Sequence, residues 1–458
     1  MNGKQLLLKA IRNEQTPRAA WVPFVGCHGG FLIGKTATEH AKSADLIFQG
    51  AKRARELYKP DGLPVCFDLQ VEAEILGCQL HWADDVPPSV TTHPLEEGKT
   101  LDQLPPFEET KGRIPVVLQA LRMMKKDMGE EVAIYGLLCG PFTLALHLLG
   151  NDIFLKMFDE PEEVKKVMDY CVSIANKMSD WYLRDGADVV AIVDPMTSQI
   201  SPDMFEEFVG PYVNKVCDHI RAKNGLSALF VCGDVTRNLE VMLATTCDAL
   251  HVDEQIDMAA FRSLAEKANK AFGGNIPLTV ALLLGSEDTC KRATLNILDT
   301  CGTKGFILAP GCDLTYHTPA KNLQAVTQMV HDAYARDAIR ATAAVDSGDS
   351  FDDILAPDFT QKGLLRLDLI TLDSASCAPC QYMYDAALRA AKAAKTGSVK
   401  IEVIEHKIKV REGIGMMIRL GVKALPTICI DGVVSFVSII PDQPTLIAAI
   451  EKAALAKQ

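Results

Sequence analysis

The feature that most constrains the fold is the repeated alternation of short apolar runs with longer amphipathic stretches. Helical patterns such as 161–186 and 201–225 separate apolar runs of strand length. Eight such runs lie at 21–26, 63–68, 132–140, 188–194, 227–234, 248–254, 270–276 and 305–313. They predict parallel βα units, which a (β/α)8 TIM-like barrel accommodates best, with a doubly wound sheet as the alternative. We therefore expect an α/β barrel over residues 1–340.

Several of these runs end in residues that carry chemistry. In a barrel the carboxyl ends of all strands share one face, where catalytic groups normally lie. Cys232 and Cys312 stand near the ends of two runs, and Asp194 ends a third. Asp194 would orient a substrate or accept a proton, and the competing interpretation is a helix cap or loop anchor.

Composition and charge exclude some classes of protein. The chain has 47 basic and 59 acidic residues, a net charge of −12, whereas nucleic-acid binders usually carry a basic surplus. No apolar stretch approaches the roughly 18–20 residues that cross a bilayer, and the first residues do not form a signal peptide. The 14 cysteines are scattered along a long chain, which is typical of reduced thiols. We expect a cytoplasmic protein.

After a predicted linker at 341–360, residues 361–458 form a second unit around two cysteines. A strand-like run leads into Cys377-Ala378-Pro379-Cys380, and a helical pattern follows directly. A thiol at a helix N-terminus is near unpaired N–H groups that stabilise its thiolate. This context predicts a redox dithiol. The alternative is half of a zinc knuckle, for which the unit offers only His406 and Cys429 as further ligands.

The order of elements in residues 361–458 resembles the thioredoxin fold. Leu425-Pro426-Thr427 is similar to the cis-proline turn of that family. The resemblance implies that Cys377 is the nucleophile and Cys380 the resolving thiol, with a thioredoxin reductase-type protein as electron donor. The motif differs from the common Trp-Cys-Gly-Pro-Cys.

The first unit resembles the uroporphyrinogen decarboxylase superfamily, in particular its methylcobamide methyltransferase branch. The segments that carry the resemblance are 227–243 and 305–323, with support from 68–80, 137–150 and 193–212. The heme-pathway decarboxylase of this superfamily uses an arginine-rich loop after the first strand. Here that loop is Gly26-Cys27-His28-Gly29-Gly30, without arginine.

In the methyltransferase branch, a His-x-Cys and a later Cys hold zinc, which binds the acceptor thiol as a thiolate. The resemblance gives Cys232 and Cys312 as metal ligands, and the alternative is two buried free thiols. Phe230 occupies the histidine position and cannot bind a metal, so either another strand end supplies the third ligand or the metal is absent. We consider His28 first, and Cys27, Cys66, Cys139 and Glu254 are further candidates.

The resemblance implies a corrinoid-linked methyltransferase whose barrel-mouth site is assisted by the fused dithiol. No Asp-x-His-x-x-Gly motif occurs, so methylcobalamin would arrive on a corrinoid protein or as a free methylcobamide. One alternative is a decarboxylase or other lyase that acts through Asp194 without metal. The other is a thiol-disulfide oxidoreductase whose barrel recruits the partner. The sequence names neither the methyl donor nor the acceptor.

Overall fold

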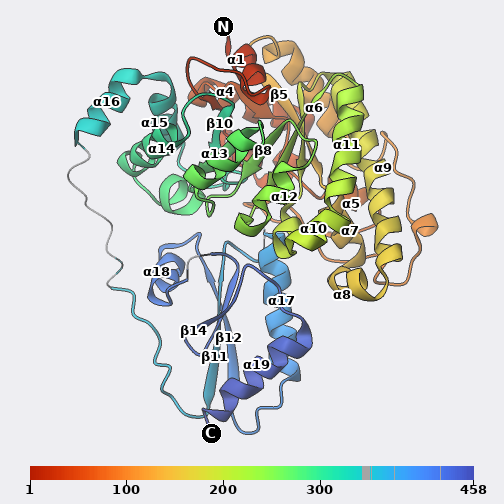
Figure 1. Cartoon of the computed structure of the whole chain (residues 1–458), viewed down its shortest axis with the longest axis vertical. Helices are drawn as coiled ribbons and strands as arrows, with labels where there is room; N and C mark the ends of the chain where they lie inside the picture. The colour runs from red at the N-terminus through yellow and green to blue at the C-terminus, as the bar shows by residue number, and fades with distance from the viewer. Residues whose placement is uncertain (343–350, 352, 376, 423) are drawn as a thin grey trace. The chain divides into compact units, whose positions relative to one another are not determined.

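A computed structural model describes residues 1–342, 351, 353–375, 377–422 and 424–458. The chain divides into two compact units, Met1–Ala344 and Val345–Gln458 (Figure 1). Most of the predicted linker core, 343–350 and 352, lies outside the described residues.

The first unit is a nearly closed barrel of eight parallel strands. They are β1 (Ala20–Trp21), β2 (Gly62–Pro64), β5 (Ala133–Cys139), β6 (Val189–Val193), β7 (Leu226–Val231), β8 (Ala249–Val252), β9 (Ala271–Ile276) and β10 (Phe306–Pro310). Their order is β1-β10-β9-β8-β7-β6-β5-β2, so the strands run around the ring in chain order. This order confirms the predicted barrel, and the doubly wound alternative is wrong because β1 pairs with β10.

The helices of the first unit surround this ring. They are α1 (Gly3–Ile11), α2 (His28–Leu32), α3 (Ala37–Ala41), α4 (Ala44–Tyr58), α5 (Val71–Ile75), α6 (Ile114–Met128), α7 (Pro141–Leu149), α8 (Asp152–Asp159), α9 (Pro161–Asp185), α10 (Pro202–Phe208), α11 (Gly210–Ala222), α12 (Leu239–Leu243), α13 (Met258–Lys267), α14 (Glu287–Cys301), α15 (Ala320–His331) and α16 (Ala333–Thr342). Shorter turns are η1 (Leu101–Gln103), η2 (Pro195–Gln199), η3 (Thr236–Asn238) and η4 (Leu278–Leu283), and β3 (Leu80–His81) pairs with β4 (Ser89–Val90).

Two of the helical patterns in the sequence have different outcomes. The pattern at 161–186 is one helix, α9, which ends at Gly186 with a φ of 112° that favours glycine. The pattern at 201–225 is divided into α10 and α11 at Val209. Pro211 explains the break, because proline has no N–H to continue the first helix and is favoured in the first turn of the second.

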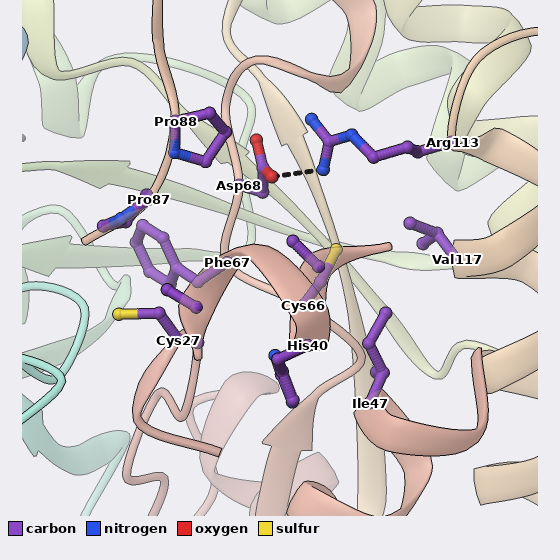
Figure 2. A pocket seen from close by; sticks show the side chains of 13 residues that line it. Cys27, His40, Ile47, Cys66, Phe67, Asp68, Pro87, Pro88, Arg113 and Val117 are labelled. Atoms are coloured by element: carbon purple, nitrogen blue, oxygen red, sulfur yellow. Dashed lines mark hydrogen bonds and ion pairs between the residues drawn. The ribbon is translucent and has the colours of Figure 1, made fainter. Parts of the chain in front are cut away.

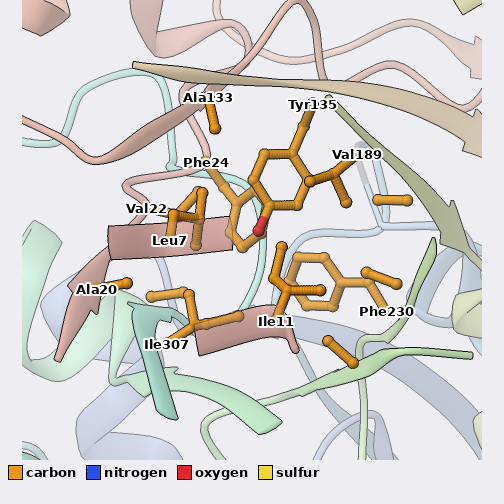
Figure 3. Close-up of a cluster of buried hydrophobic side chains, with 14 of the residues drawn as sticks. Leu7, Ile11, Ala20, Val22, Phe24, Ala133, Tyr135, Val189, Phe230 and Ile307 are labelled. Atoms are coloured by element: carbon orange, nitrogen blue, oxygen red, sulfur yellow. The ribbon is translucent and has the colours of Figure 1, made fainter. Parts of the chain in front are cut away.

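The core of the barrel is layered along its axis. Leu7 and Ile11 of α1 pack against small residues at the amino ends of the strands, such as Ala133 (Figure 3). Further along the axis the interior is aromatic. Phe24 and Phe230 lie with ring centroids 4.9 Å apart. Bulky side chains therefore fill the barrel, as in other barrels of this type, and leave chemistry to the carboxyl ends of the strands.

A single residue joins β1 to β2 where the ring would otherwise be open. The N–H of Asp61, just before β2, donates to the carbonyl of Trp21 at 2.8 Å. In return the N–H of Trp21 donates to Oδ2 of Asp61, also at 2.8 Å. Arg18 pairs with both carboxylate oxygens of Asp61 at 2.6 and 2.7 Å. We call this connection the β1–β2 seam.

The second unit is a four-stranded sheet with helices on both faces. Its elements are β11 (Leu364–Thr371), α17 (Ala378–Ala393), β12 (Lys400–Lys407), α18 (Arg411–Arg419), β13 (Thr427–Ile430), β14 (Val433–Val437) and α19 (Gln443–Leu455). The sheet order is β12-β11-β13-β14; β11 is parallel to β12 and antiparallel to β13. Leu367 and its alternating neighbours pack with α17 and α19, whereas Ile370 packs with α18. The Leu425–Pro426 bond is cis.

Across the described part of the chain, every helix is too short or too polar to span a bilayer.

Candidate active site

Two cysteines meet at the carboxyl face of the barrel. Cys232 follows β7 directly, and Cys312 follows β10 after one glycine. Their Cα atoms are 5.9 Å apart, and their sulfurs are joined as a disulfide. Both residues are half-buried. The barrel therefore brings together two residues that are 80 positions apart in sequence, and both keep part of their surface exposed.

Carboxylates from neighbouring loops hold the segments that carry this pair. Oδ2 of Asp253, after β8, accepts from the N–H of Gly233 at 2.9 Å. Oδ1 of Asp313 accepts from the N–H of Gly26 at 2.9 Å. Gly311 must be glycine, because a Cβ there would lie 2.5 Å from the backbone nitrogen of Glu254. These contacts fix the backbone on both sides of the cysteine pair.

The residues around the pair do not complete a zinc site. A structural or catalytic zinc takes three or four protein ligands. Within the described residues, no group of three His, Cys, Asp or Glu side chains is arranged to hold a metal. Phe230 fills the histidine position with a ring that packs 5.7 Å from Phe67 and 5.5 Å from His251. Two sulfur donors are present, and the third is missing.

His28 is not free to be that third ligand in this arrangement. It lies in the first turn of α2 and is fully buried. Its Nδ1 bonds the carbonyl of Tyr316 at 3.0 Å, and its Nε2 bonds the hydroxyl of Tyr58 at 2.8 Å. Burial lowers the pKa of His28 to about 4, so the ring is neutral. Both ring nitrogens of His28 are therefore occupied by hydrogen bonds within the protein.

Glu254 is also engaged. Burial and the neighbouring Asp253 raise its pKa to about 8. Its Oε2 accepts from the N–H of Leu278, at the start of η4.

Asp194 anchors a helix. It is fully buried, and its oxygens accept from the N–H of Phe142 at 3.1 Å and from the N–H and hydroxyl of Thr143 at 2.7 and 2.6 Å. These donors lie in the first turn of α7, which favours an acceptor of this kind. Burial raises the pKa of Asp194 to about 6. Of the two interpretations of this residue, the geometry matches the helix anchor.

The second unit places its two cysteines as the sequence predicts, at the start of a helix. Cys377 is the N-cap of α17 and is half-exposed, whereas Cys380 is buried and its sulfur accepts from the N–H of Leu372 at 3.4 Å. The expectation of a stabilised Cys377 thiolate is wrong in this structure. The hydrogen bond with Cys380, followed by burial, raises the pKa of Cys377 well above its ordinary value. The backbone N–H of Cys380 and Lys409 act in the opposite direction and are outweighed.

The residues needed for a zinc knuckle in this unit are engaged elsewhere. His406 bonds Oδ1 of buried Asp368 at 2.7 Å. Cys429 lies in β13, buried beside Asp368 in the register of the sheet. Neither is near enough to the dithiol to form a metal group with it among the described residues.

A pocket that the sequence did not indicate lies at the carboxyl ends of β1 and β2 (Figure 2). Buried Arg113 pairs there with Asp68 through Nη1, and its Nε donates to Glu74 at 2.8 Å. The guanidinium lies 4.9 Å from the ring centre of Trp82. No local pattern marks Arg113 in the sequence, because it stands just before α6, far along the chain from its carboxylate partners.

Comparison with known proteins agrees with this architecture. The sequence model of the uroporphyrinogen decarboxylase (URO-D) family matches residues 2–333. Methylcobamide:CoM methyltransferase MtbA of Methanosarcina mazei is 29% identical over 333 residues, covering 71% of this chain and 96% of that protein. Uroporphyrinogen decarboxylase of Trichodesmium erythraeum is 24% identical, covering 62% of this chain and 82% of that protein. A solved methyltransferase from Methanosarcina mazei, 26% identical, superposes with a TM-score of 0.66 and covers 74% of this chain and 99% of that one.

Proposed function

The chain belongs to the uroporphyrinogen decarboxylase family, and on that premise we propose that it transfers a methyl group from a methylcobamide to a thiol or another soft acceptor. The observation that carries the proposal is the meeting of Cys232 and Cys312 at the barrel mouth. The resemblance to the methyltransferase branch gives these two positions as sulfur ligands, and the match to MtbA of Methanosarcina mazei covers 96% of that protein.

In the proposed reaction the acceptor thiolate attacks the methyl carbon of the methylcobamide. The sulfur–carbon bond forms as the carbon–cobalt bond breaks, and the electron pair of that bond stays on cobalt. The methylcobamide is a substrate, free or carried by a corrinoid protein. A bound zinc ion would act as a Lewis acid that stabilises the acceptor thiolate. The described residues offer only two sulfur ligands at this place, so we assign no step to a metal.

The redox state of the cysteine pair decides whether the site has soft donors. Reduced, Cys232 and Cys312 offer two thiols at the mouth; joined as a disulfide, they offer none. We propose that the second unit is a thioredoxin-like domain that keeps the pair reduced. Its strand order and the position of Cys377 at a helix start favour this assignment.

The exchange balances in two steps. Cys377 gives up its proton as its sulfur attacks one sulfur of the Cys232–Cys312 disulfide, and the other sulfur leaves as a thiolate that takes up a proton. The Cys380 thiolate then attacks Cys377, which frees the barrel dithiol and leaves a Cys377–Cys380 disulfide. An external dithiol donor of the thioredoxin reductase type returns two electrons to this disulfide. A reducing compartment such as the cytoplasm suits such a cycle.

The first experiment measures methyl transfer. Reduced full-length protein is mixed with methylcobalamin and a panel of thiols, and the cobalamin absorption spectrum is followed. We expect thiol-dependent demethylation in wild type and in Cys301→Ala, a buried cysteine away from the mouth, with at least a tenfold loss in Cys312→Ser. Carbon dioxide release from a porphyrinogen without any demethylation would instead favour the lyase.

The second experiment isolates the role of the dithiol. Oxidised protein is incubated with thioredoxin reductase and NADPH, and thiols at Cys232 and Cys312 are counted by mass spectrometry after alkylation. Wild type should recover both thiols, whereas a Cys377→Ser, Cys380→Ser double variant should not. Equal recovery in the two proteins would refute the assistance, and would leave the methyl transfer to be judged by the first experiment.

A further inference from the structure

A second pair of cysteines, Cys217 and Cys247, lies in contact away from the barrel mouth. Cys217 belongs to α11, and Cys247 lies in the loop just before β8. Their exposed fractions are 0% and 1%, and both are thiols in the structure. The two sulfurs are 2.6 Å apart, closer than the roughly 3.5–4.0 Å at which non-bonded heavy atoms usually pack. No other atom fits between them.

The short distance between the sulfurs favours a disulfide over a metal site. A zinc ion holds thiolate sulfurs at about 2.3 Å in a tetrahedral arrangement, which keeps two such sulfurs about 3.8 Å apart. A disulfide needs about 2.05 Å, so the bond closes when the sulfurs approach by about half an ångström. Burial raises the pKa of Cys217 well above its ordinary value, and the hydrogen bond with Cys247 adds to this shift. At neutral pH Cys217 is therefore an uncharged thiol.

Side-chain hydrogen bonds hold the loop 244–248, which carries Cys247. Nζ of Lys270 donates to the carbonyl of Cys247 at 2.5 Å. Nη2 of Arg221 donates to the carbonyl of Thr246, which is half-buried, so the loop lies at the surface beside Cys247. Surface loops of this kind open locally far more often than strands of the core. An opening of this loop exposes Cys247 without unfolding of the barrel.

We propose that Cys217 and Cys247 are an oxidation site, which hydrogen peroxide closes as a second disulfide of the barrel. While the loop is open, the sulfur of Cys247 attacks one peroxide oxygen and forms a sulfenic acid. The oxygen–oxygen bond breaks, and the other oxygen leaves as water with the thiol proton. The sulfur of Cys217 then attacks the sulfenic sulfur. The sulfur–sulfur bond forms as the sulfur–oxygen bond breaks, and the hydroxyl leaves with the Cys217 proton as a second water.

The closed bond cross-links the barrel at the end opposite the mouth. The two cysteines are 30 positions apart, and the segment between them contains β7 and Cys232. They lie near the amino ends of β7 and β8, on the face that serves stability in barrels of this type. The bond therefore restrains, from its far end, the unit that carries Cys232. Once the loop closes again, burial shields the bond from thiol reductants. Neither sulfur takes part in the proposed methyl transfer, so the two proposals are tested separately.

The test maps disulfides in reduced full-length protein after treatment with hydrogen peroxide. Remaining thiols are blocked with N-ethylmaleimide in denaturant, and tryptic peptides are analysed by mass spectrometry without reduction. The three cysteines of this region, Cys217, Cys232 and Cys247, fall in separate tryptic peptides, so each linkage has its own mass. Arg221→Ala removes a bond that holds the loop, and Arg53→Ala makes the same change at a position of similar exposure on α4.

We expect the Cys217–Cys247 linkage in wild type to be at least tenfold more abundant than any other linkage of either cysteine. It should form at least threefold faster in Arg221→Ala than in wild type or Arg53→Ala, because the loop opens more often. Dithiothreitol added to the folded, oxidised protein should open Cys232–Cys312 at least tenfold faster than Cys217–Cys247.

Recovery of Cys217 and Cys247 as free thiols, in protein whose Cys232 and Cys312 are joined, would overturn the inference. A linkage of Cys217 or Cys247 to another cysteine as the main product would do the same. Equal rates of closing in Arg221→Ala and wild type would refute access through the loop, and equal rates of reduction would refute the shielding.

Discussion

The disulfide between Cys232 and Cys312 should make the thermal stability of the barrel depend on redox state. A cross-link stabilises mainly by restricting the unfolded chain, and the effect grows with the length of the closed loop. The two cysteines are 80 positions apart. For a loop of that length the chain-entropy relation gives about 4.5 kcal/mol at 25 °C.

This free energy converts into a measurable shift of the melting temperature. The first unit has 344 residues, Met1–Ala344, and unfolding entropy is about 2.1 cal/mol/K per residue. The product is about 0.7 kcal/mol/K, so about 4.5 kcal/mol corresponds to a shift of roughly 6 °C. Oxidised protein should therefore melt about 6 °C higher than protein treated with a strong reductant.

Tryptophan fluorescence reports this transition without interference from the second unit. The chain has three tryptophans, Trp21, Trp82 and Trp181, and all lie in the first unit. In Cys312→Ser the melting temperature should be the same with and without reductant, close to that of reduced wild type. An equal melting temperature for oxidised and reduced wild type would show that these sulfurs do not form the cross-link, and the argument built on their exchange would fail.

Three further predictions follow from the site residues. Phe230→His supplies the missing third donor, so the reduced variant should retain about one zinc ion per chain through dialysis, and wild type should retain far less. The zinc content is measured by mass spectrometry of the metal. Equal zinc content in both proteins would mean that another group completes the site. Because the pKa of Cys377 is raised, its alkylation by iodoacetamide should be slower at pH 7 than that of free cysteine and should still be rising above pH 9; a plateau below pH 8 would contradict the raised pKa. Asp194→Asn leaves a buried N–H of α7 without an acceptor and should lower the free energy of unfolding by about 1–3 kcal/mol in urea titrations; unchanged stability together with lost activity would restore a catalytic role.

The sequence predicts those parts of the molecule that depend on local patterns. Apolar runs and caps are local, so the strands of the barrel and the helix after Cys377 lie where the patterns indicate. The meeting of Cys232 and Cys312 is also predictable, because a barrel gathers all strand ends on one face.

Contacts between segments that are distant in the sequence could not be predicted from local patterns. His28 stands after the first strand, as a ligand would, but its nitrogens are taken by Tyr58 and Tyr316. Asp194 follows a strand, which is where a catalytic acid would be expected. Its oxygens accept hydrogen bonds from the first turn of α7, and the sequence does not show that α7 begins beside it. For Cys377 the helix terminus is visible in the sequence, whereas the side-chain hydrogen bond with Cys380, which raises the pKa of Cys377, is not.

The β1–β2 seam has a consequence for how the barrel opens. Neighbouring strands elsewhere in the ring are joined by ladders of backbone bonds, such as the five residue pairs of β5 with β6. At the seam, β1 and β2 are joined instead by one backbone hydrogen bond and by one hydrogen bond to the carboxylate of Asp61. The amide hydrogens of Trp21 and Asp61 should therefore exchange with solvent through a local opening, whereas those of β6 should exchange only on global unfolding. The ring would part first between its first two strands, and Arg18, by holding Asp61, would set how often it does so.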